Sequence, residues 1–229
     1  MAAQSIDTFE LAEEVRCCTE DLDERAQRVQ LALFRLLAEG APVDPDRLAV
    51  RSALPGSEVH ELLERWHGVH YDKAGRIVAF QGLSVVEAPH RLRVDGRELY
   101  AWCAWDTLFL PGLIGHPADI ESSCPATGAT VTLHVGPGGP SAVSPPDAAL
   151  SFIRPGASFG QDTIASFCRF VHFFASPEAA RQWTRRHPGT FDISIEQGFE
   201  IGRRSNAAQL GTALAEGGWS DPDGERSTT

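Results

Sequence analysis

The sequence lacks the hydrophobic segments that would direct a chain into or across a membrane. No run approaches the roughly 20 apolar residues of a membrane-spanning helix. The first residues, MAAQSIDTFELAEEVRCC, are acidic and lack the basic and apolar regions of a signal peptide. We therefore expect a cytoplasmic protein.

Positive charge is also scarce. Lys73 is the one lysine, and the formal net charge is −11. Binding to nucleic acid or to an anionic membrane needs clustered basic residues, so this balance disfavours both. We expect neither as a partner.

Cysteine is too sparse and too scattered for a disulfide scaffold. The five cysteines are Cys17, Cys18, Cys103, Cys124 and Cys168. The sequence has no Cys-x-x-Cys motif and no His-x-x-x-His pair in a metal-binding context, so a zinc site fits poorly. In a reducing compartment these residues are free thiols, metal ligands or nucleophiles.

The composition nevertheless supports a folded core. Apolar residues make up 42% of the 229 residues, which is enough for one larger domain or two small ones. The pattern predicts an α+β fold, with an N-terminal winged-helix-like three-helix unit followed by a mixed, mainly antiparallel sheet domain with helices. We expect an acidic arm over 1–23, the helical unit over 24–88, the α+β sheet domain over 89–216 and a disordered tail over 217–229.

The winged-helix outline rests on three helical stretches and a hairpin. A helix is predicted from Arg25 to Glu39, because Val29, Leu33, Leu36 and Leu37 form an apolar stripe on one face. Two further helices are predicted over 42–54 and over 54–68, the second with Ser57 as N-cap. Two extended runs follow, joined by a turn at 72–75. The third helix carries three glutamates that would repel DNA phosphates, so a DNA-reading role is disfavoured. The arm that precedes this unit is expected to be a frayed helix or a mobile segment.

The second part of the chain mixes strands and helices. Asp95-Gly96 predicts a hairpin turn, and two strands joined by CPATG follow. GPGGPSAVSPP reads as a loop. IASFCRFVHFFAS predicts a buried strand on which Cys168 alternates with aromatic residues on one face. Ser176 is then expected to cap a helix, and a last strand leads into another.

One stretch, LYAWCAWDTLFLPGLIG, places Cys103 and Asp106 in apolar surroundings. If a helix begins near Ala101 or Trp102, the thiol lies in its first turn and the carboxylate one turn further on the same face. A helix N-terminus favours a thiolate, and a carboxylic acid beside it would be a proton donor. The alternative is that Cys103 fills the core and Asp106 caps the helix.

The remaining cysteines carry weaker signals. Cys168 and Cys124 read as core or structural residues when taken alone, and the adjacent Cys17 and Cys18 are either soft-metal ligands or incidental. A papain-like pairing of a cysteine with His172 or His134 has no local support, because nothing marks either histidine as a base.

Three motifs in order give a more specific indication. LYAWCAWDTLFLPGLIG, SSCPATGATVTL and SFCRFVHFFAS together closely resemble the organomercurial lyases (alkylmercury lyases) of bacterial mercury resistance. The resemblance runs from about Arg25 to Arg203. It implies cleavage of a carbon–mercury bond by protonolysis to a hydrocarbon and Hg(II), without an organic cofactor.

The resemblance also implies a catalytic set. Two cysteines and one aspartate carry the reaction in this family, and the motifs place them at Cys103, Cys168 and Asp106, which would also hold the mercury. Thiolates suit a soft metal, and an acid in a dry pocket suits protonation of the leaving carbon. External thiols are expected for turnover, with mercuric reductase as acceptor of the Hg(II).

Some positions depart from the family pattern or lie outside it. Arg169 stands where many members have a second cysteine, and Cys124 matches a cysteine read as structural. Cys17 and Cys18 fall outside the resemblance, and a role in passing Hg(II) between thiols is one reading of them. The rival functions are a non-catalytic thiol protein that binds or transfers Hg(II) or another soft metal on the same fold, and a winged-helix regulator that senses metal.

Overall fold

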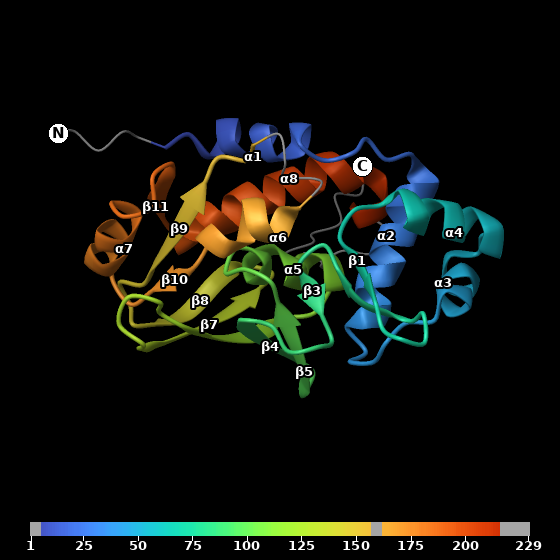
Figure 1. Cartoon of the computed structure of the whole chain (residues 1–229), viewed down its shortest axis with the longest axis horizontal. Helices are drawn as coiled ribbons and strands as arrows, with labels where there is room; N and C mark the ends of the chain where they lie inside the picture. The colour runs from blue at the N-terminus through green and yellow to red at the C-terminus, as the bar shows by residue number, and fades with distance from the viewer. Residues whose placement is uncertain (1–5, 157–161, 216–229) are drawn as a thin grey trace, which may run out of the picture.

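The computed structural model describes residues 6–156 and 162–215. Its helices and strands form an α+β fold in which helices cover one side of a large antiparallel sheet (Figure 1). The tail predicted over 217–229 lies outside the described residues. Within them, no helix combines the length and the apolar character needed to cross a membrane.

Four helices come first along the chain. They are α1 (Thr8–Cys17), α2 (Glu24–Leu37), α3 (Pro45–Ser52) and α4 (Gly56–Arg65). Asp23 caps α2 by accepting a 2.8 Å hydrogen bond from the backbone N–H of Ala26, and the buried face of the helix carries the predicted leucines. Gly40, with φ +82°, takes the left-handed conformation just beyond the helix, as a C-terminal glycine does.

Eight strands form the main sheet. They are β1 (Val69–Tyr71), β2 (Ile77–Phe80), β3 (Leu83–Ser84), β4 (His90–Val94), β5 (Arg97–Ala101), β6 (Ala118–Ser123), β7 (Thr130–Gly136) and β8 (Gly139–Ser144). Their order is β1-β2-β3-β5-β4-β6-β7-β8, and every neighbouring pair is antiparallel. Asp95 and Gly96 both have positive φ, which is the two-residue turn that the Asp-Gly sequence predicts.

A second sheet and four helices complete the fold. The sheet has the order β10-β9-β11, formed by β10 (Phe173–Phe174), β9 (Ala149–Ile153) and β11 (Thr190–Ser194). The helices are α5 (Asp106–Ile114), α6 (Thr163–Ser166), α7 (Pro177–Thr184) and α8 (Ile195–Ala215). Ser176 caps α7 as predicted, since its hydroxyl accepts a hydrogen bond from the backbone N–H of Ala179.

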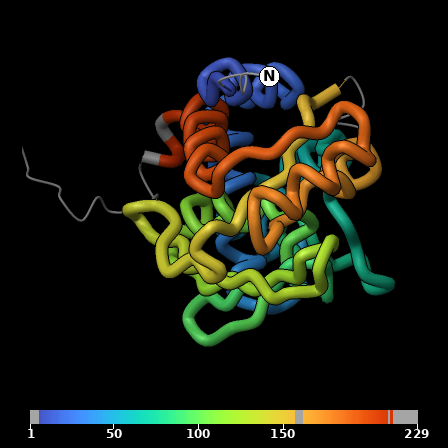
Figure 2. The backbone as a smooth tube through the Cα atoms, turned by 90° about the vertical axis from the view of Figure 1, so that its left-hand side faces the viewer, coloured from blue at the N-terminus to red at the C-terminus, as the bar shows by residue number. Residues whose placement is uncertain are grey.

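Within the acidic N-terminal segment, residues 8–17 form an ordered helix, so of the two predicted alternatives the helix is found and the mobile arm is not. Asp7 caps α1, and Leu11, Ala12 and Val15 are buried. The helix packs along α8, as Figures 1 and 2 show from two sides. The sequence signal was weak because only this narrow stripe is apolar and its partner lies about 190 positions away. One hydrophobic cluster joins residues of α1, the N-terminal helices and the sheets; the predicted domain boundaries stay a prediction.

Three further local predictions are wrong. Helix α4 begins at Gly56 behind Pro55, so Ser57 is inside the helix and does not cap it. The Gly- and Pro-rich stretch is not all loop, because Pro137-Gly138 turn the chain and β8 pairs with β7 at the sheet edge, where a proline is tolerated. Cys168 lies on a 3₁₀ turn over 168–170 rather than on a long strand.

Candidate active site

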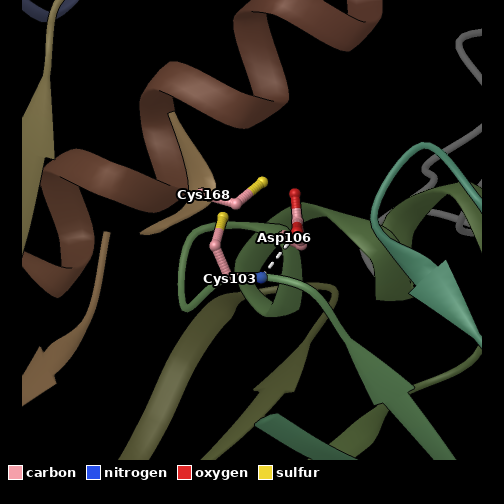
Figure 3. Close-up of side chains that lie close together, drawn as sticks. All are labelled: Cys103, Asp106 and Cys168. Atoms are coloured by element: carbon pink, nitrogen blue, oxygen red, sulfur yellow. Dashed lines mark hydrogen bonds between the residues drawn. The ribbon is translucent and has the colours of Figure 1, made fainter. Parts of the chain in front are cut away.

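The structure brings Cys103, Asp106 and Cys168 together (Figure 3). The two sulfur atoms and a carboxylate oxygen lie within 4.8 Å of one another. All three residues are buried, with exposed fractions of 0%, 6% and 3%. Cys103 and Cys168 are 65 positions apart, so it is the fold, and not local spacing, that makes this cluster.

The turn between β5 and α5 holds Cys103 and Asp106 at a fixed distance. The backbone N–H of Cys103 donates a 2.8 Å hydrogen bond to Oδ2 of Asp106, and the hydroxyl of Thr107 donates to the carbonyl of Ala104. Helix α5 begins at Asp106, so Cys103 precedes the helix and is not in its first turn as expected. The carboxylate reaches back to an N–H three residues earlier, as the acidic residue of a capping box does.

Backbone pairing brings the second thiol to this turn. The N–H of Ala104 donates to the carbonyl of Val171 at 3.2 Å, and the N–H of Val171 donates to the carbonyl of Cys168 at 3.1 Å. Asp162 caps the short α6 just before the turn that carries Cys168. The alternating apolar pattern of this segment does not by itself separate a strand from a compact turn, which explains the mistaken strand.

Gly82 is a site residue that the sequence analysis missed. Its φ is +101°, and a Cβ placed there would lie 2.6 Å from Cγ of Asp106. The backbone N–H of Trp102 donates to the carbonyl of Gly82, which ties the glycine to the same turn. Only a glycine both adopts this conformation and leaves room for the carboxyl group. In the sequence, the sign of this position was a Gln-Gly pair directly after a predicted extended run, which indicates a turn.

Burial controls the ionisation of the cluster. It raises the pKa of Asp106 to about 7, against the opposing effect of the hydrogen bonds from the backbone and side chain of Cys103. Burial also raises the pKa of the Cys103 thiol well above its usual range. For Cys168, the hydrogen bond with Cys103 lowers the pKa, but burial and the nearby Asp106 outweigh it, so the net pKa is raised. Near neutral pH the thiols therefore hold their protons, and Asp106 is close to half-ionised.

A cavity of about 350 Å³ reaches Asp106 from the surface. Its walls include the aromatic side chains Phe34, Trp66, Trp102, Trp105, Phe109 and Phe167. Trp105 is held in place because its indole N–H donates to the carbonyl of Gly198 at 2.9 Å. The cavity suits an apolar organic group whose polar or metallic end meets the buried carboxyl and the sulfur atoms beside it.

The other candidate residues lie elsewhere. Cys124 is buried in the connection between β6 and β7, where its N–H donates to the carbonyl of Ala129. His172 Nε2 lies 2.8 Å from the carbonyl of Arg169, and His134 Nδ1 lies 2.9 Å from a carboxylate oxygen of Asp119, so both rings have partners outside the cluster.

The last two candidate positions are Arg169 and the cysteine pair at the end of α1. The exposed Arg169 lies with its guanidinium 5.2 Å from the ring centre of Phe170. Cys17 and Cys18, by contrast, line the cavity that reaches Asp106. The sequence predicted no such shared cavity.

Comparison with known proteins places these observations in a family. The family model described as alkylmercury lyase matches residues 83–206. An alkylmercury lyase of Staphylococcus epidermidis is 42% identical over 179 residues, covering 76% of this chain and 80% of that protein. The alkylmercury lyase of Pseudomonas putida is 42% identical over 172 residues, covering 75% and 80%. That of Streptomyces lividans is 38% identical over 178 residues, covering 78% and 81%.

A solved structure supports the fold. The crystal structure of the mercury-bound form of MerB2 superposes with a TM-score of 0.72 at 22% sequence identity, covering 86% of this chain and 97% of that one. The family-model match spans more than half of the chain, and the relatives in three organisms are similar over most of their length. The chain therefore belongs to the alkylmercury lyase family and is an alkylmercury lyase.

Proposed function

We propose that Cys103, Asp106 and Cys168 are the catalytic residues of this lyase. The observation that carries the proposal is the meeting of two sulfur atoms and one carboxylate oxygen within 4.8 Å in a buried site. Mercury is a soft metal and prefers sulfur ligands, so two thiolates at this spacing suit a single mercury ion.

The reaction begins with capture of the organomercurial by one thiol. Its sulfur bonds to mercury as the bond between mercury and its previous counter-ligand breaks, and the proton of the thiol leaves with that counter-ligand. The aromatic wall of the cavity holds the organic group, and burial of the site keeps water away from it.

Asp106 then moves a proton from the second thiol to carbon. Its carboxylate accepts the proton of that thiol, and the freed sulfur becomes a second ligand of mercury. This raises the electron density on the carbon–mercury bond. The carboxylic acid donates the proton to the carbon as that bond breaks, so a hydrocarbon leaves and Hg(II) stays on two sulfur atoms.

The pKa of Asp106 suits both halves of this proton transfer. A group with a pKa of about 7 is present in both protonation states near neutral pH. An ordinary aspartate would hold too little of the acid form, and a carboxyl with a much higher pKa would be a donor only.

We further propose that no organic cofactor takes part and that small thiols in the cytoplasm remove the Hg(II). A mercuric reductase is the expected acceptor downstream. Two thiolates hold Hg(II) tightly, and incoming thiols exchange with them without redox change.

The deciding experiment incubates the pure protein with an arylmercury salt and excess small thiol and measures free arene. The proposal expects release of more than one arene per chain. The Asp106→Ala variant separates a lyase from a thiol-based carrier, since a lyase loses arene release while it still binds Hg(II). No arene from the unmodified protein contradicts the proposed activity.

A further inference from the structure

The adjacent cysteines at the end of α1 share a cavity with the catalytic cluster. Cys17, Cys18 and Asp106 all line this cavity. Cys17 is exposed, Cys18 is half-buried and Asp106 is buried. One cavity is thus lined both by this pair of thiols and by the carboxyl group of the active site.

The two thiols are held on an ordered element. Leu11, Ala12 and Val15 bury one face of α1 against the core, and the helix lies along α8 (Figure 1). The N–H of Cys18 donates to the carbonyl of Val15 at 3.1 Å, which fixes the chain at the helix end. The pair therefore has a defined place in the lining of the cavity.

A positive charge accompanies the outer sulfur. The guanidinium of Arg16 donates a hydrogen bond to Sγ of Cys17 at 3.7 Å. The same guanidinium is ion-paired to Glu13 on the helix and to Asp21 beyond it, which holds it beside the thiols. A cation at this place complements the negative charge of a sulfur that binds a metal.

We propose that Cys17 and Cys18 form a second Hg(II) site, which receives the product of the reaction and clears the active site. This inference rests on the proposed function for the source of the Hg(II). Adjacent thiols are chemically suited to a soft divalent cation, and oxygen- or nitrogen-preferring ions gain nothing from them.

The transfer is a ligand exchange. Two mercury–sulfur bonds, to Cys103 and Cys168, break, and two form to Cys17 and Cys18. Two protons pass from the entering thiols to the leaving thiolates, so protons and mercury–sulfur bonds both balance. No electron changes hands, so neither an oxidant nor a reductant is needed.

A binding experiment tests the site without using lyase activity. The Cys103→Ser/Cys168→Ser variant is mixed with HgCl₂ and an excess of glutathione, separated by gel filtration and assayed for mercury per chain. We expect one Hg(II) per chain, and its loss when Cys17→Ser and Cys18→Ser are added. No retained Hg(II) in the first variant, or retention in the second, overturns the proposal.

A loading experiment tests the transfer itself. The unmodified protein and the Cys17→Ser/Cys18→Ser variant are each loaded with one Hg(II) per chain, freed of excess, and given one equivalent of arylmercury without small thiol. We expect near-stoichiometric arene from the unmodified protein and at least a fivefold smaller amount from the variant. Equal amounts overturn the transfer.

Two controls keep these outcomes separate. The Cys124→Ala variant removes a thiol outside the cavity and is expected to behave as the unmodified protein in the loading experiment. The unloaded unmodified protein, which has both thiol pairs free, tests the proposed lyase activity. Failure of that activity therefore appears as a lack of arene before loading, whereas failure of the second site appears only in the two comparisons above.

Discussion

The backbone N–H of Cys103 donates a 2.8 Å hydrogen bond to Oδ2 of Asp106. This bond points the carboxyl group toward the two sulfur atoms and keeps it there although the site is buried. One residue of the catalytic set thereby positions another through its main chain, so a change of the Cys103 side chain leaves this contact in place. The effect of each side chain can therefore be tested separately.

Asp106→Asn is expected to abolish the proton transfer and to keep both sulfur ligands of mercury in place. The amide has nearly the same shape, but it neither takes the proton of a thiol nor donates one to carbon with comparable ease. We expect single-turnover arene release to fall by about 10²- to 10⁴-fold, the usual contribution of a general acid–base group. Hg(II) retention after gel filtration should be unchanged, and a loss of both would contradict the assigned role.

Cys103→Ser and Cys168→Ser are each expected to reduce arene release to the background rate. A hydroxyl oxygen is a poor ligand for a soft metal, so the substitution removes one of the two mercury–sulfur bonds. The measurement is arene release with excess small thiol, alongside circular dichroism to confirm folding. Cys124→Ala is the matched control, because Cys124 is also buried but lies outside the cluster, and it should keep the activity. Full activity in Cys168→Ser would exclude a two-thiol mechanism.

The buried carboxyl predicts a pH-dependent stability. Asp106 has a folded-state pKa of about 7, above the 3.8 of an unperturbed aspartate. Below about pH 4 both the folded and the unfolded state hold the proton, and the full contribution of protonated Asp106 to the free energy of unfolding is present. Between about pH 4 and pH 7 the unfolded state loses the proton while the folded state keeps it, so the free energy of unfolding falls as pH rises. Above about pH 7 the contribution levels off.

Urea unfolding of the unmodified protein and of Asp106→Asn isolates this effect from other titrating groups. At about 1.4 kcal/mol per pH unit, the difference in unfolding free energy between the two proteins should change by about 4 kcal/mol from pH 4 to pH 8, with the unmodified protein losing stability. A difference that stays constant over this range would mean that Asp106 ionises like an exposed aspartate.

Local signals in the sequence were sufficient for many elements. The stripe of α2, the Asp95-Gly96 turn and the Ser176 cap each depend on a few neighbouring residues, and the structure confirms all three. The predicted strand at Cys168 failed because a short apolar run has the same pattern in a strand and in a compact turn. Tertiary pairing with Ala104 decides between them.

The active site likewise depends partly on local motifs and partly on contacts that form only in the folded chain. The motif resemblance identified the residues of the cluster, but their contact depends on pairing across 65 positions, which no local pattern encodes. Gly82 escaped notice because a lone glycine after an extended run reads as an ordinary turn. Its role depends on the approach of Asp106, a contact that exists only in the folded chain.

Gly82→Ala is expected to displace the carboxyl group of Asp106. The new Cβ would lie 2.6 Å from Cγ of Asp106, and the φ of +101° is unfavourable for alanine. We expect a loss of about 1–3 kcal/mol in the free energy of unfolding from backbone strain, and a fall in single-turnover arene release of at least tenfold because the proton donor is moved. Hg(II) retention on the two thiols should remain.

Gly75→Ala separates the effect of backbone strain from the effect of displacing the Asp106 carboxyl group. Gly75 has a similarly positive φ of +79° in the β1–β2 turn, and a Cβ there meets nothing within 4 Å. This variant should lose a comparable amount of stability and keep its arene release. If Gly82→Ala and Gly75→Ala reduced activity equally, the loss would follow from general destabilisation, and the close approach of Gly82 to Asp106 would have no part in placing the proton donor.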